Sequence, residues 1–192
     1  MKIGILGGSF NPIHTGHAIL ANYITQNTDI EQLWLMVSPQ NPLKSDMSVS
    51  YDVYRLTMTE LVASKCDNVI TSGFEFTLPR PSYTIDTLNA LKLKFPQHEF
   101  VLIIGADNWS NFKKWKDYNI IIDNHEIMVY PRIGYEIIIP NELKHRVTKL
   151  DSPIVEISST YIGEQLKHQR NMSFYLPQDV YRYILENKLY LE

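Results

Sequence analysis

Apolar residues along this chain form short continuous runs that alternate with segments of helical spacing. The alternation predicts βαβ units that build a parallel sheet. We therefore expect an α/β protein with a Rossmann-like, doubly wound parallel sheet in a single domain that covers residues 1–192. The runs predict strands at 2–6, 33–37, 69–76, 99–104, 126–130 and 154–157. The helical spacing predicts helices at 17–24, 53–64, 84–95, 160–169 and 177–187.

Ligands of such sheets bind beyond the carboxyl ends of the strands, where the connections diverge. Four candidate loops follow predicted strands and should line one crevice. They begin at Gly7, Ser38, Gly105 and Ser158.

The composition of the chain argues against several classes of protein. The formal net charge is −3 and no basic tract occurs, which argues against a nucleic-acid partner. The one cysteine, Cys66, excludes an internal disulfide framework and fits a reducing compartment. The apolar stretch at 100–104 is too short to span a bilayer, and the residues ahead of Gly7 are too few for a signal peptide. We expect a cytoplasmic protein with no membrane partner.

The run GGSFNPIHTGH at residues 7–17 follows the first predicted strand and precedes a predicted helix. Glycines let the backbone approach a ligand closely, and the free N–H groups at a helix start attract anions. The run is neither GxGxxG nor a Walker motif, so its chemistry depends on His14 and His17, which can project to one side. A purely structural interpretation makes Gly7 and Gly8 a tight turn and the histidines capping residues.

Zinc binding by these histidines would need a third ligand, and neither Cys66 nor the scattered acidic residues supply a suitable cluster. We therefore expect no metal site made by the protein. The remaining histidines match no motif and are expected at the surface: His98, His125, His145 and His168.

The pattern GG.F.P.H.GH resembles the HxGH signature of the nucleotidyltransferase superfamily. Four later segments follow in the order seen in bacterial nicotinate mononucleotide adenylyltransferases: PSYTIDT at 81–87, IGAD at 104–107, KKW at 113–115 and ISSTYI at 157–162. The resemblance implies an enzyme of NAD biosynthesis that joins ATP to nicotinate mononucleotide and gives deamido-NAD and pyrophosphate.

The reaction that this resemblance implies is a direct in-line attack of the mononucleotide phosphate on the α-phosphorus of ATP. His14 and His17 are then catalytic as electrostatic stabilisers, since nucleotidyl transfer requires positioning and charge stabilisation rather than a protein nucleophile. Mg²⁺ should arrive with ATP, held mainly by phosphate oxygens and water. The oligomeric state is left open, and a homo-oligomer is compatible with the sequence.

For ATP, the resemblance implies contacts from strand ends and helix starts. Asp107 could instead be a helix N-cap, and the hydroxyls at 158–160 also suit ordinary capping. The implied ATP-binding residues are Gly7, Gly8, Ser9, Phe10, Gly105, Asp107, Arg132, Ser158, Ser159 and Thr160.

For nicotinate mononucleotide, the resemblance implies phosphate ligands, amides at a helix start and a tryptophan that stacks on the pyridine ring. On residue type alone, Lys44 could be a solvated lysine, Ser82 or Thr84 an N-cap, and Trp115 a core residue, with Trp109 as its competitor. The implied residues are Lys44, Arg55, Ser82, Tyr83, Thr84 and Trp115.

One position departs from the family pattern, which has arginine after ISST.I where this chain has Gly163. Lys167, Arg170 or Arg132 could replace the missing contact, and Gly163→Arg is expected to tighten ATP binding. The departure also keeps open a nucleotide-binding regulator whose catalysis has decayed. The nearest enzymatic rival is another adenylyltransferase or cytidylyltransferase of the superfamily.

Overall fold

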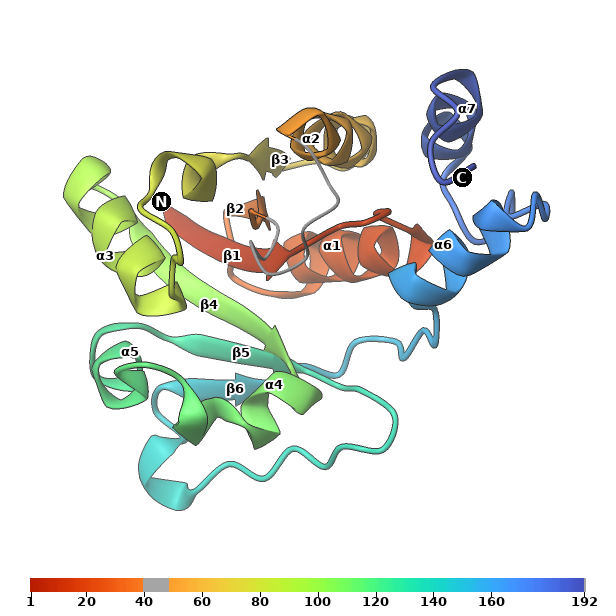
Figure 1. The fold of residues 1–192 in the computed structure, drawn as a ribbon. Helices are drawn as coiled ribbons and strands as arrows, with labels where there is room; N and C mark the ends of the chain where they lie inside the picture. Colours follow the sequence, from red (N-terminus) through yellow and green to blue (C-terminus); the bar gives the residue numbers. More distant parts are fainter. Residues whose placement is uncertain (40–48, 192) are drawn as a thin grey trace.

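A computed structural model describes residues 1–39 and 49–191, with only the backbone described at residues 49 and 50. Six parallel strands of this part of the chain form one sheet in the order β3-β2-β1-β4-β5-β6. This confirms the predicted doubly wound α/β class (Figure 1). The strands are β1 Lys2–Gly8, β2 Gln32–Val37, β3 Val69–Ser72, β4 Glu99–Gly105, β5 Ile127–Tyr130 and β6 Val147–Lys149.

Helices cover both faces of the sheet because alternate strand residues are apolar on both sides. In β2, Leu33 and Leu35 belong to one core cluster and Trp34 and Met36 to the other. The first cluster includes residues of α1 Thr15–Asn27, α2 Val49–Ala63, α6 Ser159–Lys167 and α7 Gln178–Glu186. The second includes residues of α3 Thr84–Lys94, α4 Ala106–Ser110 and α5 Tyr118–Asn124. Short 3₁₀ helices are η1 Phe74–Thr77, η2 Phe112–Lys114 and η3 Asn141–Leu143.

The strand order reverses between β1 and β4, which lie side by side in the middle of the sheet (Figure 1). After β1 the chain enters α1 and then returns in β2 on one side, whereas after β4 it continues to β5 on the other. Connections diverge at this point, so the fold opens a crevice beside the ends of β1 and β4.

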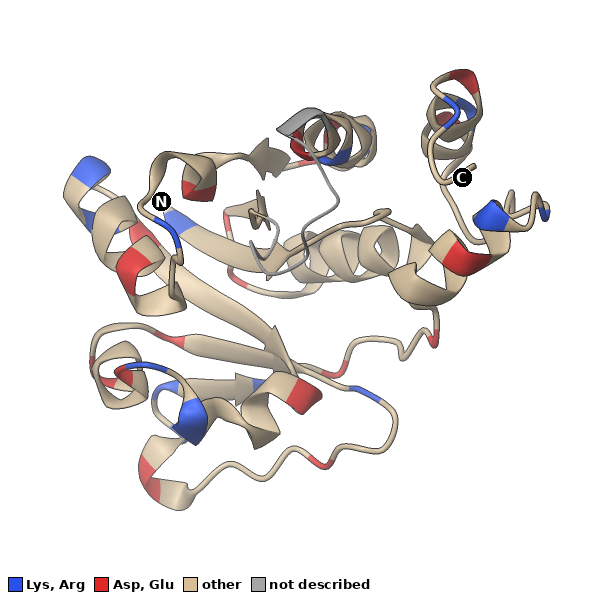
Figure 2. Cartoon of the chain, in the orientation of Figure 1, with Lys and Arg blue, Asp and Glu red and all other residues tan. Residues whose placement is uncertain are grey.

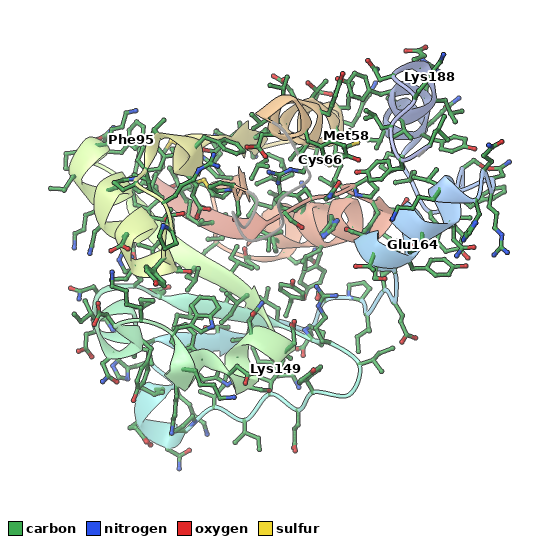
Figure 3. All side chains as sticks on the ribbon, viewed as in Figure 1. Met58, Cys66, Phe95, Lys149, Glu164 and Lys188 are labelled. Carbon is green, nitrogen blue, oxygen red and sulfur yellow. The ribbon has the colours of Figure 1, made fainter. Side chains whose placement is uncertain are left out.

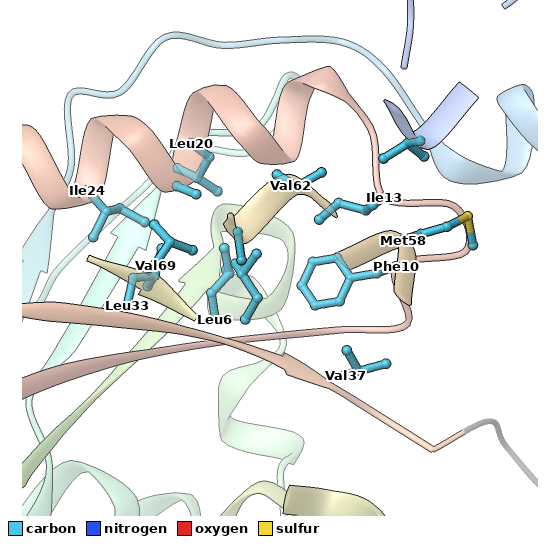
Figure 4. Close-up of a cluster of buried hydrophobic side chains, with 14 of the residues drawn as sticks. Leu6, Phe10, Ile13, Leu20, Ile24, Leu33, Val37, Met58, Val62 and Val69 are labelled. Atoms are coloured by element: carbon cyan, nitrogen blue, oxygen red, sulfur yellow. The ribbon is translucent and has the colours of Figure 1, made fainter. Parts of the chain in front are cut away.

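The loop between β1 and α1 is anchored by two apolar side chains. Phe10 is 2% exposed and Ile13 is fully buried, and both point into the first core cluster near Leu6 and Met58 (Figure 4). Phe10 also has a φ of 45°, a left-handed conformation that a bulky residue keeps only when its surroundings hold it. Core packing therefore fixes the backbone that leads to His14.

One predicted strand is too long and another does not form. The strand expected at 69–76 ends at Ser72, because Gly73 starts the 3₁₀ turn η1. The run at 154–157 pairs with no strand, and the sixth strand is β6, only three residues long. Ile157 packs against the first core cluster, but Ile154 is 54% exposed, so the core does not account for the apolar character of the whole run.

One expected surface residue is buried. His125 is 5% exposed, and its Nδ1 donates a hydrogen bond to the carbonyl of Phe100 at 3.1 Å, so this backbone partner lets the ring enter the interior. His145 and His168 are exposed and His98 is half-buried.

Acidic and basic side chains are interspersed over the molecule (Figure 2). Cys66, half-buried with a free thiol, packs against the first core cluster near Met58 (Figure 3). In the part of the chain that the structure describes, no helix has both the length and the apolar character needed to cross a bilayer.

Candidate active site

A cavity of about 640 Å³ opens beside the ends of the central strands. The start of α1, the start of α4, the segment after β5 and the segment before α6 all contribute to its wall. With Tyr175, which precedes α7, it is assembled from five regions of the sequence. Its main polar lining residues are His14, His17, Asp107, Arg132, Ser152, Glu156 and Ser158.

The two histidines of the first motif lie against each other at the cavity wall. His14 is the N-cap residue of α1 and His17 lies in its first turn. Their rings stack with centroids 3.7 Å apart and planes 26° from parallel, so they do project to one side, as the spacing predicts. Gly16 is required between them: a Cβ there would lie 3.1 Å from Nδ1 of His14. The glycine of the motif thus makes room for the ring of His14.

A backbone contact selects the donor atom of His17. The amide of His14 donates a hydrogen bond to Nδ1 of His17 at 3.2 Å. In a neutral imidazole one nitrogen accepts and the other carries the proton. Nε2 of His17 therefore carries the proton and is the atom that can donate to a ligand.

Both rings are neutral in the free protein at pH 7. Burial, helped by the positive charge of Arg132, lowers the pKa of His14 from 6.5 to about 4. Burial and the neighbouring His14 and Arg132 lower the pKa of His17 well below 6.5. The histidines thus offer hydrogen bonds, while Arg132 supplies permanent positive charge at this wall.

Asp107 and Arg132 form an ion pair at the cavity wall. Oδ1 of Asp107 and Nε of Arg132 are 3.7 Å apart, and both atoms are buried without a hydrogen-bond partner among the described residues. Gly105, not Asp107, is the N-cap of α4, so the capping alternative for Asp107 is wrong. A Cβ on Gly105 would lie only 2.3 Å from Oδ1 of Asp107. Gly105 therefore acts by leaving space for that carboxylate.

Residues 7–13 of the first motif do not line the cavity, whereas His14 does. β1 continues through Gly7 and Gly8, so the tight turn expected at these glycines is wrong, and the left-handed residue is Phe10. A Cβ on Gly7 would meet nothing within 4 Å, whereas one on Gly8 would lie 3.1 Å from the ring of Phe10. Ser9 is exposed, and its carbonyl accepts a hydrogen bond from Arg55.

The three hydroxyl residues at the start of α6 have different partners. Ser158 lines the cavity and caps the helix, since its Oγ accepts from the amide of Tyr161 at 3.1 Å. Ser159 donates through Oγ to the carbonyl of Pro12 at 2.8 Å. Thr160 is exposed. Capping thus accounts for Ser158 as well as ligand contact does, and Ser159 links α6 to the motif loop.

None of the described residues expected for the mononucleotide lines this cavity. One of them, Tyr83, contacts Lys116. The ammonium nitrogen of Lys116 lies 4.6 Å from the centre of the Tyr83 ring and 3.2 Å from Asp86. Tyr83 is the N-cap of α3, so Ser82 and Thr84 are not. Lys116 directly follows Trp115 in the sequence, so it joins the start of α3 to the tryptophan segment.

Trp115 and Trp109 both contact the ring of Phe112, with centroids 5.1 and 5.5 Å away. Trp109 also donates through Nε1 to the carbonyl of Ile138 at 3.0 Å. The indole N–H of Trp109 is thus engaged with a loop, which distinguishes the two tryptophans. Both are partly buried.

Arg55 is buried, with 1% of its surface exposed. Its guanidinium donates to the carbonyls of Ser9 and Ser38, the latter at 2.8 Å, and pairs with Asp52. In this arrangement it joins the segments that follow β1 and β2, and its guanidinium is not open to a phosphate. Lys44 lies outside the described residues.

Gly163 does not line the cavity. It is buried in α6 and faces Tyr190, whose ring atoms would lie 3.8 Å from a Cβ at this position. Lys167 pairs with Glu164 at 2.9 Å (Glu164 is labelled in Figure 3), and Arg170 donates to Gln165. Of the three suggested replacements for the family arginine, Arg132 is the one in the cavity wall.

Sequence reasoning missed the segment before α6. Pro153, Ile154 and Val155 line the cavity, as do Tyr130 and Tyr135 near Arg132. The apolar residues at 154–157 resemble those of a buried strand, so the sequence predicts a strand there. Its position just before ISSTYI was the signal that could have placed it at the site.

A model of the cytidylyltransferase-like family matches residues 5–165. The chain is 45% identical over 194 residues to a probable nicotinate-nucleotide adenylyltransferase of Flavobacterium johnsoniae, with 99% of each chain covered. It is 44% identical to a protein of the same name from Bacteroides fragilis, covering 96% of this chain and 92% of that one.

Solved structures show the same fold. A nicotinic acid mononucleotide adenylyltransferase of Plasmodium falciparum complexed with NaAD superposes with a TM-score of 0.77 at 18% identity, with 98% of this chain and 97% of that chain covered. A putative nicotinate-nucleotide adenylyltransferase of Vibrio parahaemolyticus gives a TM-score of 0.72 at 21% identity, over 100% of this chain and 96% of that one.

Proposed function

This chain belongs to the cytidylyltransferase-like family and, within it, to the nicotinate-nucleotide adenylyltransferases, and we propose that it transfers the adenylyl group of ATP to nicotinate mononucleotide in NAD biosynthesis. The proposal rests on one observation: a single cavity is lined by His14, His17, Asp107 and Arg132. Hydrogen-bond donors and a permanent cation converge there on a space large enough for a nucleotide.

The proposed step is a single displacement. An oxygen of the mononucleotide 5′-phosphate attacks the α-phosphorus of ATP, a new P–O bond forms, and the bond from the α-phosphorus to the bridging oxygen breaks. That electron pair leaves with pyrophosphate. The attacking oxygen is already ionised near neutral pH, so no protein base or nucleophile takes part.

His14 and His17 stabilise the charge that spreads over the α-phosphate oxygens in this step. Nε2 of His17 carries the proton that can be donated, because Nδ1 accepts from the His14 amide. Removing one preorganised donor at such a centre costs about 10²–10³ in rate. Phosphate charge near these rings would also raise their pKa values, so the arrival of ATP makes them better donors.

Arg132 and Asp107 orient the nucleotide. The guanidinium of Arg132 attracts phosphate, and the Asp107 carboxylate, whose Oδ1 makes no hydrogen bond in the free protein, can accept from a ribose hydroxyl. The cavity also bears Ser158, whose backbone lies at the start of a nine-residue helix and favours phosphate. These residues form the ATP side of the proposed site.

Mg²⁺ fits this site as a partner of the triphosphate. Asp107 is ion-paired with Arg132, and the described residues contain no cluster of three or more His, Cys, Asp or Glu side chains that could hold a metal ion. Phosphate oxygens and water would therefore supply most of the ligands. When bound, the ion neutralises phosphate charge that Arg132 alone cannot balance.

The acceptor lies on the side of α3 and the tryptophan segment in this proposal. Amides at the start of α3, at 82–84, can receive the nicotinate carboxylate, and Trp115 offers an aromatic face to the cationic pyridine ring. Lys116 adds positive charge beside Tyr83. This chemistry favours the acid over the amide, because a neutral amide gains less from helix amides and a lysine.

We place the enzyme in the cytoplasm, with ATP and nicotinate mononucleotide as its partners. The lone, half-buried Cys66 fits a reducing compartment. The mixed distribution of charge on the surface gives no reason to add nucleic acid (Figure 2).

Pyrophosphate release from ATP and Mg²⁺ tests the function, with nicotinate mononucleotide, nicotinamide mononucleotide and phosphopantetheine as acceptors. We expect release with nicotinate mononucleotide and a loss of 10²-fold or more in His17→Ala. Release with phosphopantetheine instead would move the enzyme to another branch of the superfamily. ATP binding without release from any acceptor would favour a nucleotide-binding regulator.

A further inference from the structure

Three contacts from the C-terminal part of the chain hold the loop that carries His14. Ser159 donates to the carbonyl of Pro12 at 2.8 Å, and the amide of Thr15 donates to the carbonyl of Tyr175 at 3.0 Å. The third contact comes from the last described turn, where the hydroxyl of Tyr190 donates to Oδ1 of Asn11. α6 thus lies beside the connection between β1 and α1 (Figure 1), and the segments before and after α7 contact the same region.

Tyr190 is placed to act as a donor at this junction. Burial raises the pKa of its hydroxyl above the ordinary 10, with the neighbouring Tyr51 as a further cause, so the group stays protonated throughout the working range. Its ring meets that of Tyr51 edge-on, with centroids 5.9 Å apart. Tyr190 therefore contacts both the motif loop and the first turn of α2.

The backbone at Tyr190 supports a specific placement. Its φ is 65°, a conformation that costs an aromatic residue free energy and persists only when the surroundings hold it. The amide of the preceding Leu189 donates to the carbonyl of Ile184 at 3.0 Å, which closes the end of α7, and Lys188 marks this turn in Figure 3. The chain turns here so that the phenol faces the protein.

Gly163 in α6 leaves room for the ring of Tyr190, which lies in the turn after α7. A Cβ at 163 would sit 3.8 and 3.9 Å from ring atoms, which is ordinary contact, so alanine fits, whereas a longer side chain that extends toward Tyr190 meets its ring. Gly163, which departs from the family pattern, and the ring of Tyr190 thus pack against each other.

We propose that Tyr190 is a positioning residue for adenylyl transfer. Its hydroxyl fixes Asn11, and through the two intervening residues, Pro12 and Ile13, it fixes the N-cap ring of His14 against His17. The inference rests on the proposed function, since the loop that it holds carries the proposed donors. Small displacements of such donors are costly, because a shift of about 1 Å at a reacting centre can lower the rate up to 10²-fold.

Tyr190→Phe removes the hydroxyl and keeps the ring. We expect kcat to fall about tenfold, while KM for ATP and for nicotinate mononucleotide stays within twofold, because the loop loses alignment rather than substrate contacts. Tyr183→Phe is the matched control: this tyrosine of α7 packs edge-on against Tyr54 at 6.3 Å, and its hydroxyl makes no hydrogen bond within the described residues. It should keep the wild-type kcat.

Imidazole NMR signals supply a second readout that needs no turnover. Tyr190→Phe should shift the ring resonances of His14 more than Tyr183→Phe does. If the wild type makes no deamido-NAD, the proposed function fails while this comparison still decides whether Tyr190 holds the loop. A Tyr190→Phe protein with wild-type kcat and unshifted His14 signals overturns the inference.

Two changes at position 163 test the packing arrangement. Gly163→Ala should behave as wild type, because its Cβ finds only ordinary contacts. Gly163→Arg should displace the Tyr190 ring and reproduce the fall in kcat. A Gly163→Arg enzyme with unchanged kcat and a lower KM for ATP would contradict the arrangement and restore the phosphate role implied by the family pattern.

Discussion

The amide of His14 donates to Nδ1 of His17 at 3.2 Å, and this contact determines which atom of His17 faces a ligand as a donor. The same N-cap residue therefore starts α1, fixes the tautomer of its partner and stacks on its ring. The contacts of His14 at the start of α1 therefore also align the donor atom of His17. The consequence is that His17 acts as a neutral donor through Nε2, and its replacements can be ranked by geometry.

Glutamine should replace His17 better than asparagine does. The amide nitrogen of Gln can reach the position of the imidazole Nε2, whereas that of Asn lies near Nδ1, where the structure needs an acceptor for the His14 amide. We expect His17→Gln to keep roughly tenfold more kcat than His17→Asn, with His17→Ala lowest, 10²–10³-fold below wild type. Steady-state kinetics at saturating ATP checks the order. Equal activity in the two amide variants would mean that the tautomer has no part in catalysis.

Acid should destabilise the free protein through His14. Its pKa is lowered from 6.5 to about 4 in the fold, so the unfolded chain takes up the proton first. The stability that the neutral ring allows is fully present above pH 6.5 and is lost as the pH falls through 4. A difference of 2.5 pKa units corresponds to about 3 kcal/mol at 1.36 kcal/mol per unit.

Urea unfolding at pH 7.5, 5.5 and 4.5 measures this effect, with His14→Gln as the comparison. The variant should lose less free energy of unfolding than wild type between pH 7.5 and 4.5, because it removes one group that titrates. Parallel curves for the two proteins would show that His14 is not the group responsible.

Gly16→Ala should separate stability from activity. Gly16 lies inside α1, and alanine in a helix is favoured over glycine by about 1 kcal/mol. The added Cβ, however, would lie 3.1 and 3.2 Å from two atoms of the His14 ring, so the ring must move by a few tenths of an ångström. We expect an unchanged or higher melting temperature and a kcat at least several-fold lower. Thermal unfolding and kinetics on one preparation give both values, and a fully active variant would mean that the position of His14 tolerates this shift.

The long central elements could be predicted from sequence because each carries enough apolar residues to fix its period. β1, β2 and β4 have burial on both faces, which a continuous apolar run reports directly. β6 has only three residues, and no period can be read from three positions. The run at 154–157 was wrong because apolar residues that line a ligand cavity look the same as core residues in one dimension.

The site residues divide in the same way, into those with partners close in the sequence and those with distant partners. His14 and His17 could be predicted because their partners lie within three residues. The burial of Arg55 by Ser9 and Ser38, and the bond from Tyr190 to Asn11 across 179 positions, depend on how distant segments meet. No local pattern contains that information, so Arg55 was expected among phosphate ligands and Tyr190 was not considered.

Gly105→Ala should weaken ATP binding without unfolding the protein. The backbone at Gly105 is extended, with φ of −75° and ψ of 159°, so alanine brings no conformational strain. The new Cβ would lie 2.3 Å from Oδ1 of Asp107 and 3.2 Å from Nε of Arg132, so the carboxylate must leave its position and Arg132 must shift by a few tenths of an ångström. Hydrogen bonds to charged groups contribute about 1.5–3 kcal/mol, which corresponds to a rise in KM for ATP of roughly 10–100-fold.

Asp107→Asn is the companion variant, because it keeps the shape of the side chain and removes its charge. If the carboxylate accepts from ribose, Asp107→Asn should raise the KM for ATP less than Gly105→Ala, which also moves Arg132. Both variants should unfold in urea near the wild-type midpoint, and KM for nicotinate mononucleotide should change less than KM for ATP. A Gly105→Ala enzyme that unfolds normally and keeps its KM for ATP would remove Asp107 and Arg132 from the nucleotide site.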